Sequence, residues 1–234
     1  MEDLKAYLEK LGIRGVKNIS YFEEAFTHRS YVNEAKRKQG INHNERLEFL
    51  GDAVLELIIS QYLFQTFPDR PEGELTSFRA ATVKTETLAS VARTLGYGQY
   101  LRMSNGEEAT GGRDKDYLLA NTFEAVLGAL YLDQGIEACE SYVREKLIIL
   151  IPSIVENRLD IDPKTKFQEL AQELFKVTPI YEVIKEEGPD HNKIFTMAVI
   201  INGKELGRGE GASKQKAEEQ AATAALLSVA ADNK

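Results

Sequence analysis

The apolar positions of residues 4–156 recur at spacings of three and four, which is the repeat of an amphipathic α-helix. Segments with this repeat run for about 10–20 residues, the usual length of helices in globular proteins. Glycine-rich, proline-rich or charged breaks separate them, among others at 39–44, 67–73 and 104–116. The pattern predicts an all-α region, in which the long charged stretch at 104–116 is a mobile or ligand-binding loop.

The pattern changes after about residue 157. A helical repeat covers 163–177, with Pro163 near its start. Alternating apolar residues follow, interrupted by the pair Asn202-Gly203, which is a strong signal for a tight hairpin. Ser213 is placed to cap a last, alanine-rich helix. The strands are expected at 180–185, 193–201 and 205–211.

These patterns predict two domains of different class. An all-α domain is expected over residues 1–156, and an α+β domain with the order α-β-β-β-α over 162–234. The stretch 153–162 is the expected hinge between them. The length of 234 residues is sufficient for two domains with cores of their own.

The charge balance excludes one class of nucleic-acid binder. The chain has 37 Asp and Glu against 29 Lys and Arg, a formal net charge of −8, and both predicted domains are net negative. A uniformly basic protein of the histone kind is therefore excluded. Any contact with nucleic acid must depend on lysines that cluster locally.

Cysteine usage and hydropathy exclude several kinds of site and cellular location. Cys139 is the only cysteine of the sequence, which excludes an intrachain disulfide and a cysteine-rich zinc site. The longest uninterrupted apolar stretch, 147–151, is far shorter than the ~20 residues of a membrane helix. The N-terminus lacks the apolar core of a secretory signal. We expect a soluble, cytoplasmic protein with no membrane partner.

Acidic residues are concentrated on one predicted helix at 44–59. Glu45, Glu48 and Asp52 stand at positions i, i+3 and i+7 and so share one face. Leucine, valine and isoleucine cover much of the remaining circumference, which predicts a buried helix. Carboxylates that are stacked on a buried face repel one another, and a divalent cation such as Mg²⁺ or Mn²⁺ would relieve this repulsion.

A second apolar helix, predicted at 118–132, carries Asn121 and Glu124 at i and i+3. Gly128 would let a neighbouring helix pack closely against it. If the two helices lie side by side, Glu48, Asp52, Asn121 and Glu124 surround one point. Spacing alone leaves an alternative open, in which the acidic positions form an ordinary solvated face.

Several strings of the sequence match one known family. The string NERLEFLGDAVL at 44–55 resembles the signature of bacterial ribonuclease III, and FTHRSY at 26–31 resembles a segment upstream of it. EGELT at 72–76 and ANTFEAVLGALYLD at 120–133 fall where that family places further acidic elements. Residues 163–230 resemble the double-stranded-RNA-binding domain that follows in these enzymes.

The resemblance implies an endoribonuclease that hydrolyses double-stranded RNA with Mg²⁺, for which Mn²⁺ can substitute, and without a small-molecule cofactor. The nuclease domain would form a homodimer with two active sites across an RNA-binding groove. The products would carry 5′-phosphates, 3′-hydroxyls and two-nucleotide 3′ overhangs. Precursors of ribosomal RNA and structured messenger RNA are the implied substrates.

The resemblance also implies roles for single residues. The metal ligands would be Glu48, Asp52, Asn121 and Glu124, among which Asp52 and Glu124 would be the most strictly required. Glu45 and Glu72 match additional acidic positions of the catalytic site. Phe49 matches an aromatic side chain that enters the partner subunit, and an ordinary core position is the alternative on its own sequence evidence.

One position departs from the family pattern. Most bacterial members have aspartate where this chain has Asn121, so the site carries one negative charge fewer. A non-catalytic double-stranded-RNA-binding protein of the same fold is therefore one alternative. A metal-dependent phosphohydrolase that acts on small nucleotides is another, and it would have no need of residues 162–234.

A domain that binds duplex RNA must reach two minor grooves and the phosphates between them. The resemblance places this task on the first helix of the second domain, on the loop at 188–193 and on the start of the last helix. Gln215 stands where the family more often has a second basic residue. In the nuclease domain, His28 is interpreted as a structural hydrogen-bonding residue rather than a base. The predicted RNA-binding residues are Thr165, Lys166, Gln168, Glu169, His191, Ser213, Lys214 and Lys216.

Overall fold

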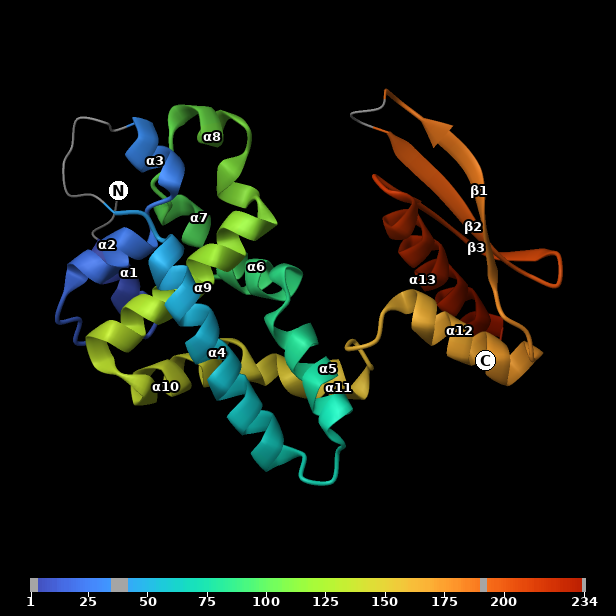
Figure 1. Ribbon diagram of the computed structural model, residues 1–234, viewed down its shortest axis with the longest axis horizontal. Coiled ribbons are helices and arrows are strands. Elements are labelled where there is room, and N and C mark those ends of the chain that lie inside the picture. The colour runs from blue at the N-terminus through green and yellow to red at the C-terminus, as the bar shows by residue number, and fades with distance from the viewer. Residues whose placement is uncertain (1–3, 35–41, 190–192, 233–234) are drawn as a thin grey trace. The chain divides into compact units, whose positions relative to one another are not determined.

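The computed structural model describes residues 4–34, 42–189 and 193–232 (Figure 1). The chain divides into two compact units, residues 1–160 and residues 161–234, and each unit is described by itself. Within the described ranges, none of the helices combines the length and the apolar character that a bilayer crossing requires.

The first unit is helical, as the apolar periodicity predicts. Three long helices, α4, α5 and α9, account for much of it, and short helices connect them (Figure 1). Its elements are α1 (Leu4–Lys10), α2 (Ile19–Ala25), α3 (Arg29–Glu34), α4 (Glu45–Thr66), α5 (Glu72–Val83), α6 (Thr85–Thr94), α7 (Tyr97–Tyr100), α8 (Asn105–Ala109), η1 (Gly112–Asp114), α9 (Asp116–Gln134), α10 (Ile136–Lys146), η2 (Ile148–Leu150) and α11 (Ile151–Glu156).

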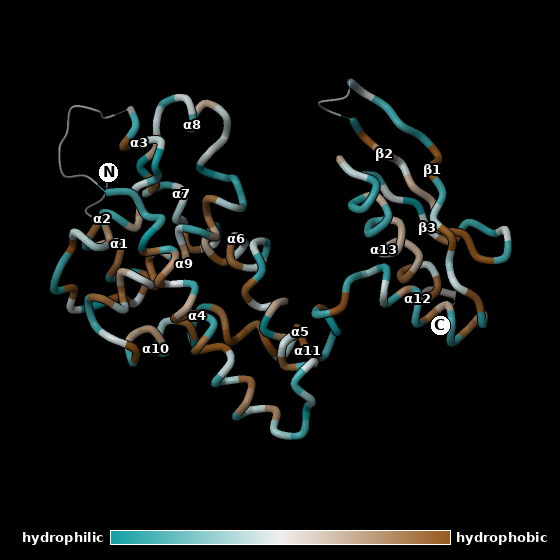
Figure 2. Tube along the Cα trace, viewed as in Figure 1, coloured by the Kyte–Doolittle hydropathy of each residue, from teal (hydrophilic) through white to brown (hydrophobic). Residues whose placement is uncertain are grey.

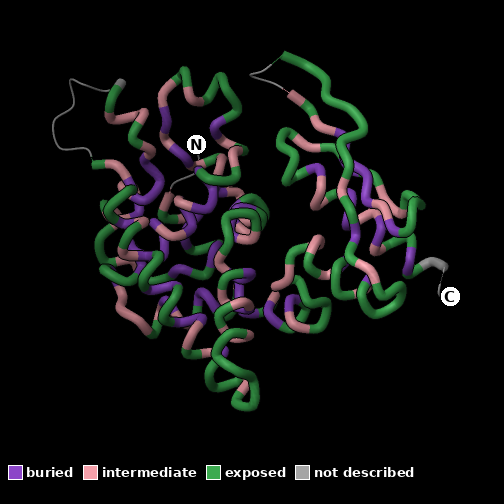
Figure 3. The backbone as a smooth tube through the Cα atoms, turned by 45° about the vertical axis from the view of Figure 1, so that its right-hand side comes forward, coloured by how far each residue is buried: buried purple, intermediate pink, exposed green. Residues whose placement is uncertain are grey.

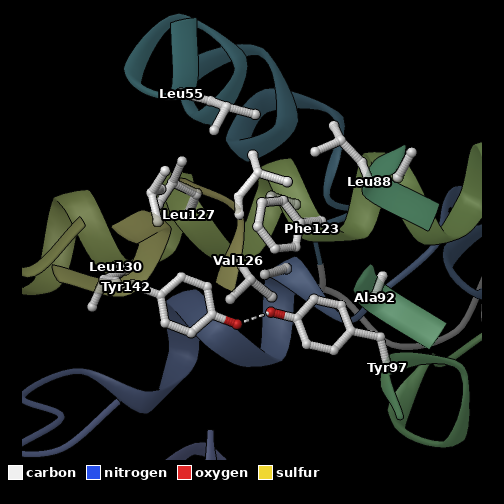
Figure 4. Packing of buried hydrophobic residues seen from close by; sticks show 14 of the residues in the cluster. Leu55, Leu88, Ala92, Tyr97, Phe123, Val126, Leu127, Leu130 and Tyr142 are labelled. Atoms are coloured by element: carbon white, nitrogen blue, oxygen red, sulfur yellow. Dashed lines mark hydrogen bonds between the residues drawn. The ribbon is translucent and has the colours of Figure 1, made fainter. Parts of the chain in front are cut away.

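Helix α9 lies at the centre of this unit, where α2, α4, α6 and α10 pack against it. Phe123 and Val126 of α9 are fully buried. Leu55 of α4 is also fully buried and lies above them in the view of Figure 4. At the same core, the hydroxyl groups of Tyr97 and Tyr142 share a hydrogen bond of 2.6 Å (Figure 4). An almost wholly apolar helix is stable here because other helices cover it on nearly every side.

The prediction of a buried helix at 44–59 is only half right. Leu47, Val54 and Ile58 of α4 are buried, but Leu57 is 59% exposed. Apolar positions continue to the end of α4, and the α4–α5 turn that follows is exposed (Figures 2 and 3). Apolar periodicity shows that a face can be buried, but not which neighbour covers it.

The stretch at 104–116 forms α8 and η1 rather than a loop without secondary structure. The Arg113 guanidinium donates hydrogen bonds to the carbonyl oxygens of Gly98 (2.8 Å) and Leu101 (2.9 Å) and pairs with Glu108 at 2.7 Å. The predicted hinge is also shorter than expected, because residues 153–156 belong to α11. Local composition gave no indication of these tertiary bonds.

The second unit has the predicted α-β-β-β-α order. Its strands form an antiparallel sheet with the order β1-β2-β3, and the helices cover one face of the sheet (Figure 1). Asn202 and Gly203 have φ values of 51° and 76°, as the predicted hairpin requires. Pro163 begins the first helix, and Ser213 caps the last. The elements are α12 (Pro163–Phe175), β1 (Ile180–Glu187), β2 (Ile194–Ile201), β3 (Lys204–Gly211) and α13 (Lys214–Asp232).

Small residues bring α13 onto the sheet. Gly207 and Gly209 of β3 face Ala221 of α13 so closely that a Cβ on either glycine would overlap its backbone. Phe167 of α12 and Met197 of β2 complete the same core. The alanine-rich helix α13 thus packs on a strand that has glycine at the points of contact. This close fit favours one fixed position of the helix along the strand.

Candidate active site

Helices α4 and α9 cross at two glycines. A Cβ on Gly51 would overlap the carbonyl oxygen of Glu124, and a Cβ on Gly128 would overlap the carbonyl oxygen of Leu47. The backbones therefore touch at this crossing. The close packing predicted from Gly128 is confirmed, and Gly51 supplies the matching surface on the other helix.

The N-terminal end of α4 is fixed by a buried asparagine. Asn44 is 4% exposed, its N–H donates to the carbonyl oxygen of Thr27 at 2.9 Å, and its side chain donates to that of Ala25 at 3.3 Å. The Glu48 N–H in turn donates to the Asn44 carbonyl oxygen at 2.9 Å. The first turn of α4, which carries Glu45 and Glu48, is thereby attached to the segment after α2.

This crossing brings the acidic faces of α4 and α9 together. Burial raises the pKa of Glu124 to about 8, with Asp52 and then Glu48 adding to the shift. Burial also raises the pKa of Glu48, as do Glu45 and Asp52, whereas a hydrogen bond from the Asn121 side chain lowers it. Carboxylates of α4 thus act on the charge of a residue of α9 that is far from them in the sequence.

The donor set of this neighbourhood suits a hard divalent cation. Glu48, Asp52 and Glu124 offer carboxylate oxygens, and Asn121 offers an amide oxygen, which are the ligand types of Mg²⁺ and Mn²⁺. The raised pKa of Glu124 indicates that the protein leaves this negative charge without full compensation. As the side chains of the described residues stand, no three His, Cys, Asp or Glu groups form a ready metal cluster.

The two additional acidic positions lie in different surroundings. Glu45 is exposed beside Arg29, at 3.5 Å, and His43, at 3.7 Å, and it raises the pKa of Glu48. Glu72 begins α5, where it accepts a hydrogen bond of 2.9 Å from Thr76. The structure therefore brings Glu45 to the α4–α9 crossing and places Glu72 on another helix.

Phe49 is 81% exposed on α4, so the alternative of an ordinary core position is wrong for this chain. Phe64, further along the same helix, is 74% exposed. Leu57 and Phe64 border a cavity of 430 Å³ between α4 and α5, which Glu72 also lines. Solvent-exposed aromatic side chains of this size along one helix are typical of an interaction surface.

Most of the predicted RNA-binding residues lie on the surface of the second unit. Thr165, Gln168 and Glu169 of α12 are exposed and line a hollow of 680 Å³. Lys166 is partly buried on the same helix, and His191 lies outside the described residues.

The start of α13 carries the predicted lysines. The Ser213 hydroxyl accepts the Lys216 N–H at 3.2 Å, which fixes the first turn. Lys214 is exposed, pairs with Glu186 of β1 at 3.1 Å and lies 5.6 Å above the Phe195 ring. Lys216 is exposed on the same turn. A helix N-terminus with two lysines is favourable for phosphate.

A polar cavity that the sequence reasoning missed opens beside the crossing. It has a volume of 370 Å³ and is lined by Glu48 and Asn121 together with His28, Ser30 and Glu107. The string FTHRSY at 26–31 was the available signal, because it combines a histidine with a hydroxyl group two residues later.

Comparison with known proteins finds a matching family model for each of the two units. A family model described as "Ribonuclease-III-like" matches residues 18–150, and one described as "Double-stranded RNA binding motif" matches residues 163–229. The protein "Ribonuclease 3" of Desulforamulus reducens is 52% identical over 199 residues, which are 85% of this chain and 80% of that protein. "Ribonuclease 3" of Streptococcus sanguinis is 47% identical over 225 residues, 95% of each chain.

A solved structure is similar to the first unit. The nuclease domain of ribonuclease III from Campylobacter jejuni aligns with a TM-score of 0.58 at 35% identity and covers 64% of this chain and 99% of that one. Its title describes flexibility in a region involved in dimer formation of that domain.

Proposed function

The chain belongs to the ribonuclease III family, and from this membership we propose that it cleaves double-stranded RNA by Mg²⁺-dependent hydrolysis of phosphodiester bonds. It is an endoribonuclease by family, with a nuclease domain followed by a double-stranded-RNA-binding domain. What we propose beyond family membership is the identity of the metal, the form of the products and the cellular substrates. The observation that carries it is the crossing of α4 and α9, where burial and then Asp52 and Glu48 raise the pKa of Glu124.

We assign residues 1–156 to catalysis and dimerisation and 162–234 to binding of the RNA duplex. Glu48, Asp52, Asn121 and Glu124 would hold Mg²⁺, with Mn²⁺ able to replace it. When bound, the ion supplies a coordinated water of lowered pKa and positive charge beside the phosphate. By the family resemblance, Asp52 on α4 and Glu124 on α9 would be the most strictly required residues.

The remaining side chains orient the site. The hydrogen bond from Asn121 favours the charged form of Glu48, which a cation ligand must adopt. Glu45 is exposed on α4 and would lie nearer to the RNA. Glu72 on α5 would act at the edge of the catalytic site.

The test of the proposal is the chemistry of the products. We expect long duplex RNA with Mg²⁺ to yield short duplexes that carry 5′-phosphates, 3′-hydroxyls and two-nucleotide 3′ overhangs, read by end-labelling and sequencing. The same assay on precursor ribosomal RNA and on structured messenger RNA tests the proposed substrates. A duplex that is bound but stays intact would contradict catalysis.

The Asn121→Asp variant is expected to lower the Mg²⁺ concentration that gives half-maximal cleavage by about tenfold. Aspartate adds a negative charge beside Glu48 and so strengthens attraction for a cation. The measurement is the initial cleavage rate against Mg²⁺ concentration. Asn157→Asp, which adds the same charge beyond the end of α11, is the control. An unchanged midpoint would mean that Asn121 is not a ligand.

Changing Lys214 and Lys216 to alanine is expected to weaken duplex binding at every RNA sequence. The plot of the logarithm of the binding constant against the logarithm of the salt concentration should become shallower by about one unit of slope per lysine. These lysines stand at the cap of α13, where phosphates would bind. Lys204→Ala is the matched control, because Lys204 begins β3, whereas the first turn of α13 follows the end of that strand. Binding is measured without cleavage, in Ca²⁺, over a range of salt concentrations. A slope equal to the control would exclude a phosphate contact.

A homodimer that buries Phe49 is part of the proposal. Phe49→Ala is expected to raise the dimer dissociation constant by roughly 10²-fold or more, because each of two symmetric copies loses a buried aromatic ring. Analytical ultracentrifugation measures the change. Leu227→Ala, which alters an exposed apolar residue of α13, should leave the constant unchanged. Equal association of both variants would exclude Phe49 from the interface.

A further inference from the structure

The 370 Å³ cavity beside the α4–α9 crossing shares two lining residues with the candidate active site. Its lining includes Glu48 and Asn121 together with His28, Ser30 and Glu107. Because it shares two proposed metal ligands, a group bound in it would lie next to the scissile phosphate. The cavity is polar, and its lining contains acceptors and donors of hydrogen bonds.

The hydrogen bonds of His28 determine which of its ring nitrogens carries the proton. The Ser30 N–H donates to Nδ1 at 3.3 Å, so Nδ1 must offer a lone pair. The Ser30 hydroxyl oxygen accepts the Ser104 N–H at 3.0 Å and lies 2.8 Å from the same Nδ1, to which it can donate. The neutral ring therefore carries its proton on Nε2, on the opposite edge.

The surroundings of His28 favour this neutral, Nε2-protonated form. Burial lowers the pKa of His28, and the nearby Glu107 opposes that shift. Among the described residues, the hydrogen bonds recorded for the ring all involve Nδ1. His28 thus lines the cavity with Nδ1 already bonded to Ser30, which leaves Nε2–H as the ring donor that can serve a ligand.

The chemistry of the lining selects a hydroxyl group over a phosphate. Glu45, Glu48 and Glu107 line the cavity and would repel a phosphate. The cations beside them are already paired, Arg29 with Glu45 at 3.5 Å and Lys115 with Glu107 at 2.7 Å. A hydroxyl group can accept from Nε2–H and donate to a carboxylate in the same position. In RNA that group is the ribose 2′-hydroxyl, by which a protein distinguishes RNA from DNA.

We propose that the cavity receives a ribose 2′-hydroxyl of a nucleotide next to the cleaved bond, with His28 Nε2–H donating to its oxygen. This inference rests on the proposed cleavage of duplex RNA. It gives His28 a role in substrate recognition, beyond the structural role that the sequence suggested. The nuclease domain would then read the sugar at the cutting point itself.

The test is a cycle that combines a protein change with a substrate change. Single 2′-deoxynucleotides are placed in turn at each nucleotide beside the cleaved bond of a duplex RNA, and single-turnover cleavage is measured. At one position, we expect the deoxy substitution to slow the wild-type enzyme about three- to tenfold, the worth of one hydrogen bond. In His28→Ala the same substitution should cause no further loss.

Two further variants keep the cycle interpretable. His28→Gln places an amide N–H near the former Nε2 and should restore part of the sensitivity to deoxy substitution. His43→Ala removes a nearby histidine beside Glu45 and should retain the full sensitivity. Equal deoxy penalties in wild type and His28→Ala would overturn the inference. Failure of the wild type to cleave the all-RNA duplex would instead overturn the proposed function.

Discussion

Glutamine in place of Glu124 is expected to reduce the single-turnover cleavage of duplex RNA by about 10²–10³-fold. Glu124 is the carboxylate of the crossing whose pKa burial raises most clearly, to about 8, and Asp52 and Glu48 contribute to that shift. Its charge is therefore costly in the folded chain, and a cation is the partner that would offset the cost. Glutamine keeps the shape and an oxygen but removes the charge.

The same variant should remain folded and bind RNA. A carboxyl group whose folded-state pKa is raised must take up a proton on folding between its ordinary pKa and about 8, and this costs stability increasingly as pH rises through that window. Glutamine has no such cost, so the thermal midpoint in metal-free buffer at neutral pH should equal or exceed that of the wild type. Duplex affinity in Ca²⁺ should be nearly unchanged.

The control for Glu124→Gln is Glu137→Gln on α10, an exposed position with the same change of charge. It should cleave at the wild-type rate. If Glu124→Gln cleaved within a few-fold of this control, Glu124 would have no part in the site. Loss of both cleavage and thermal stability would point to a structural role instead.

The second large effect concerns stability. Gly51→Ala is expected to lower the free energy of unfolding by roughly 1–3 kcal/mol or more, because the added methyl group overlaps the backbone of α9 at Glu124. For a chain of this size each kcal/mol corresponds to about 2–4 °C in the thermal midpoint. The helices must separate to accept the methyl group, so cleavage should fall as well.

Gly73→Ala separates this overlap from the general effect of replacing glycine in a helix. Gly73 lies in α5, and a Cβ there would meet no atom within 4 Å. Alanine at that position should be neutral or stabilise by about 0.5–1 kcal/mol. If Gly51→Ala unfolded at the same temperature as Gly73→Ala, the backbones of α4 and α9 would not be in contact at this crossing.

Local signals predicted the elements well because each is contained within a few residues. The Asn202-Gly203 turn adopts the two positive φ values that its residue types favour, and Ser213 caps α13 through its own hydroxyl. The helical repeat placed Glu48 and Asp52 on one face of α4 without any knowledge of its neighbours. Such features depend on backbone geometry that every helix or hairpin shares.

The candidate site was predicted only in part. Asp52 and Glu48 act on Glu124, and Asn121 forms a hydrogen bond with Glu48. Glu72 lies on α5, the described residues contain no ready metal cluster, and the shared cation stays a prediction. The place of His28 in the polar cavity was missed, because Glu48, Glu107 and Asn121, which line the cavity with it, are distant from it in the sequence. A spacing pattern cannot contain a bond between segments that only the fold brings together.

By itself, the sequence determined the order of helices and strands, the class of each domain and the helical face that carries the acidic residues. Only the tertiary structure decided that Phe49 and Leu57 of α4 are exposed while Leu47 is buried, and that Gly51 and Gly128 mark the crossing. The physical reason is the range of the forces involved. Periodicity follows from hydrogen bonds within one element, whereas burial and charge coupling depend on which faces of distant helices come into contact.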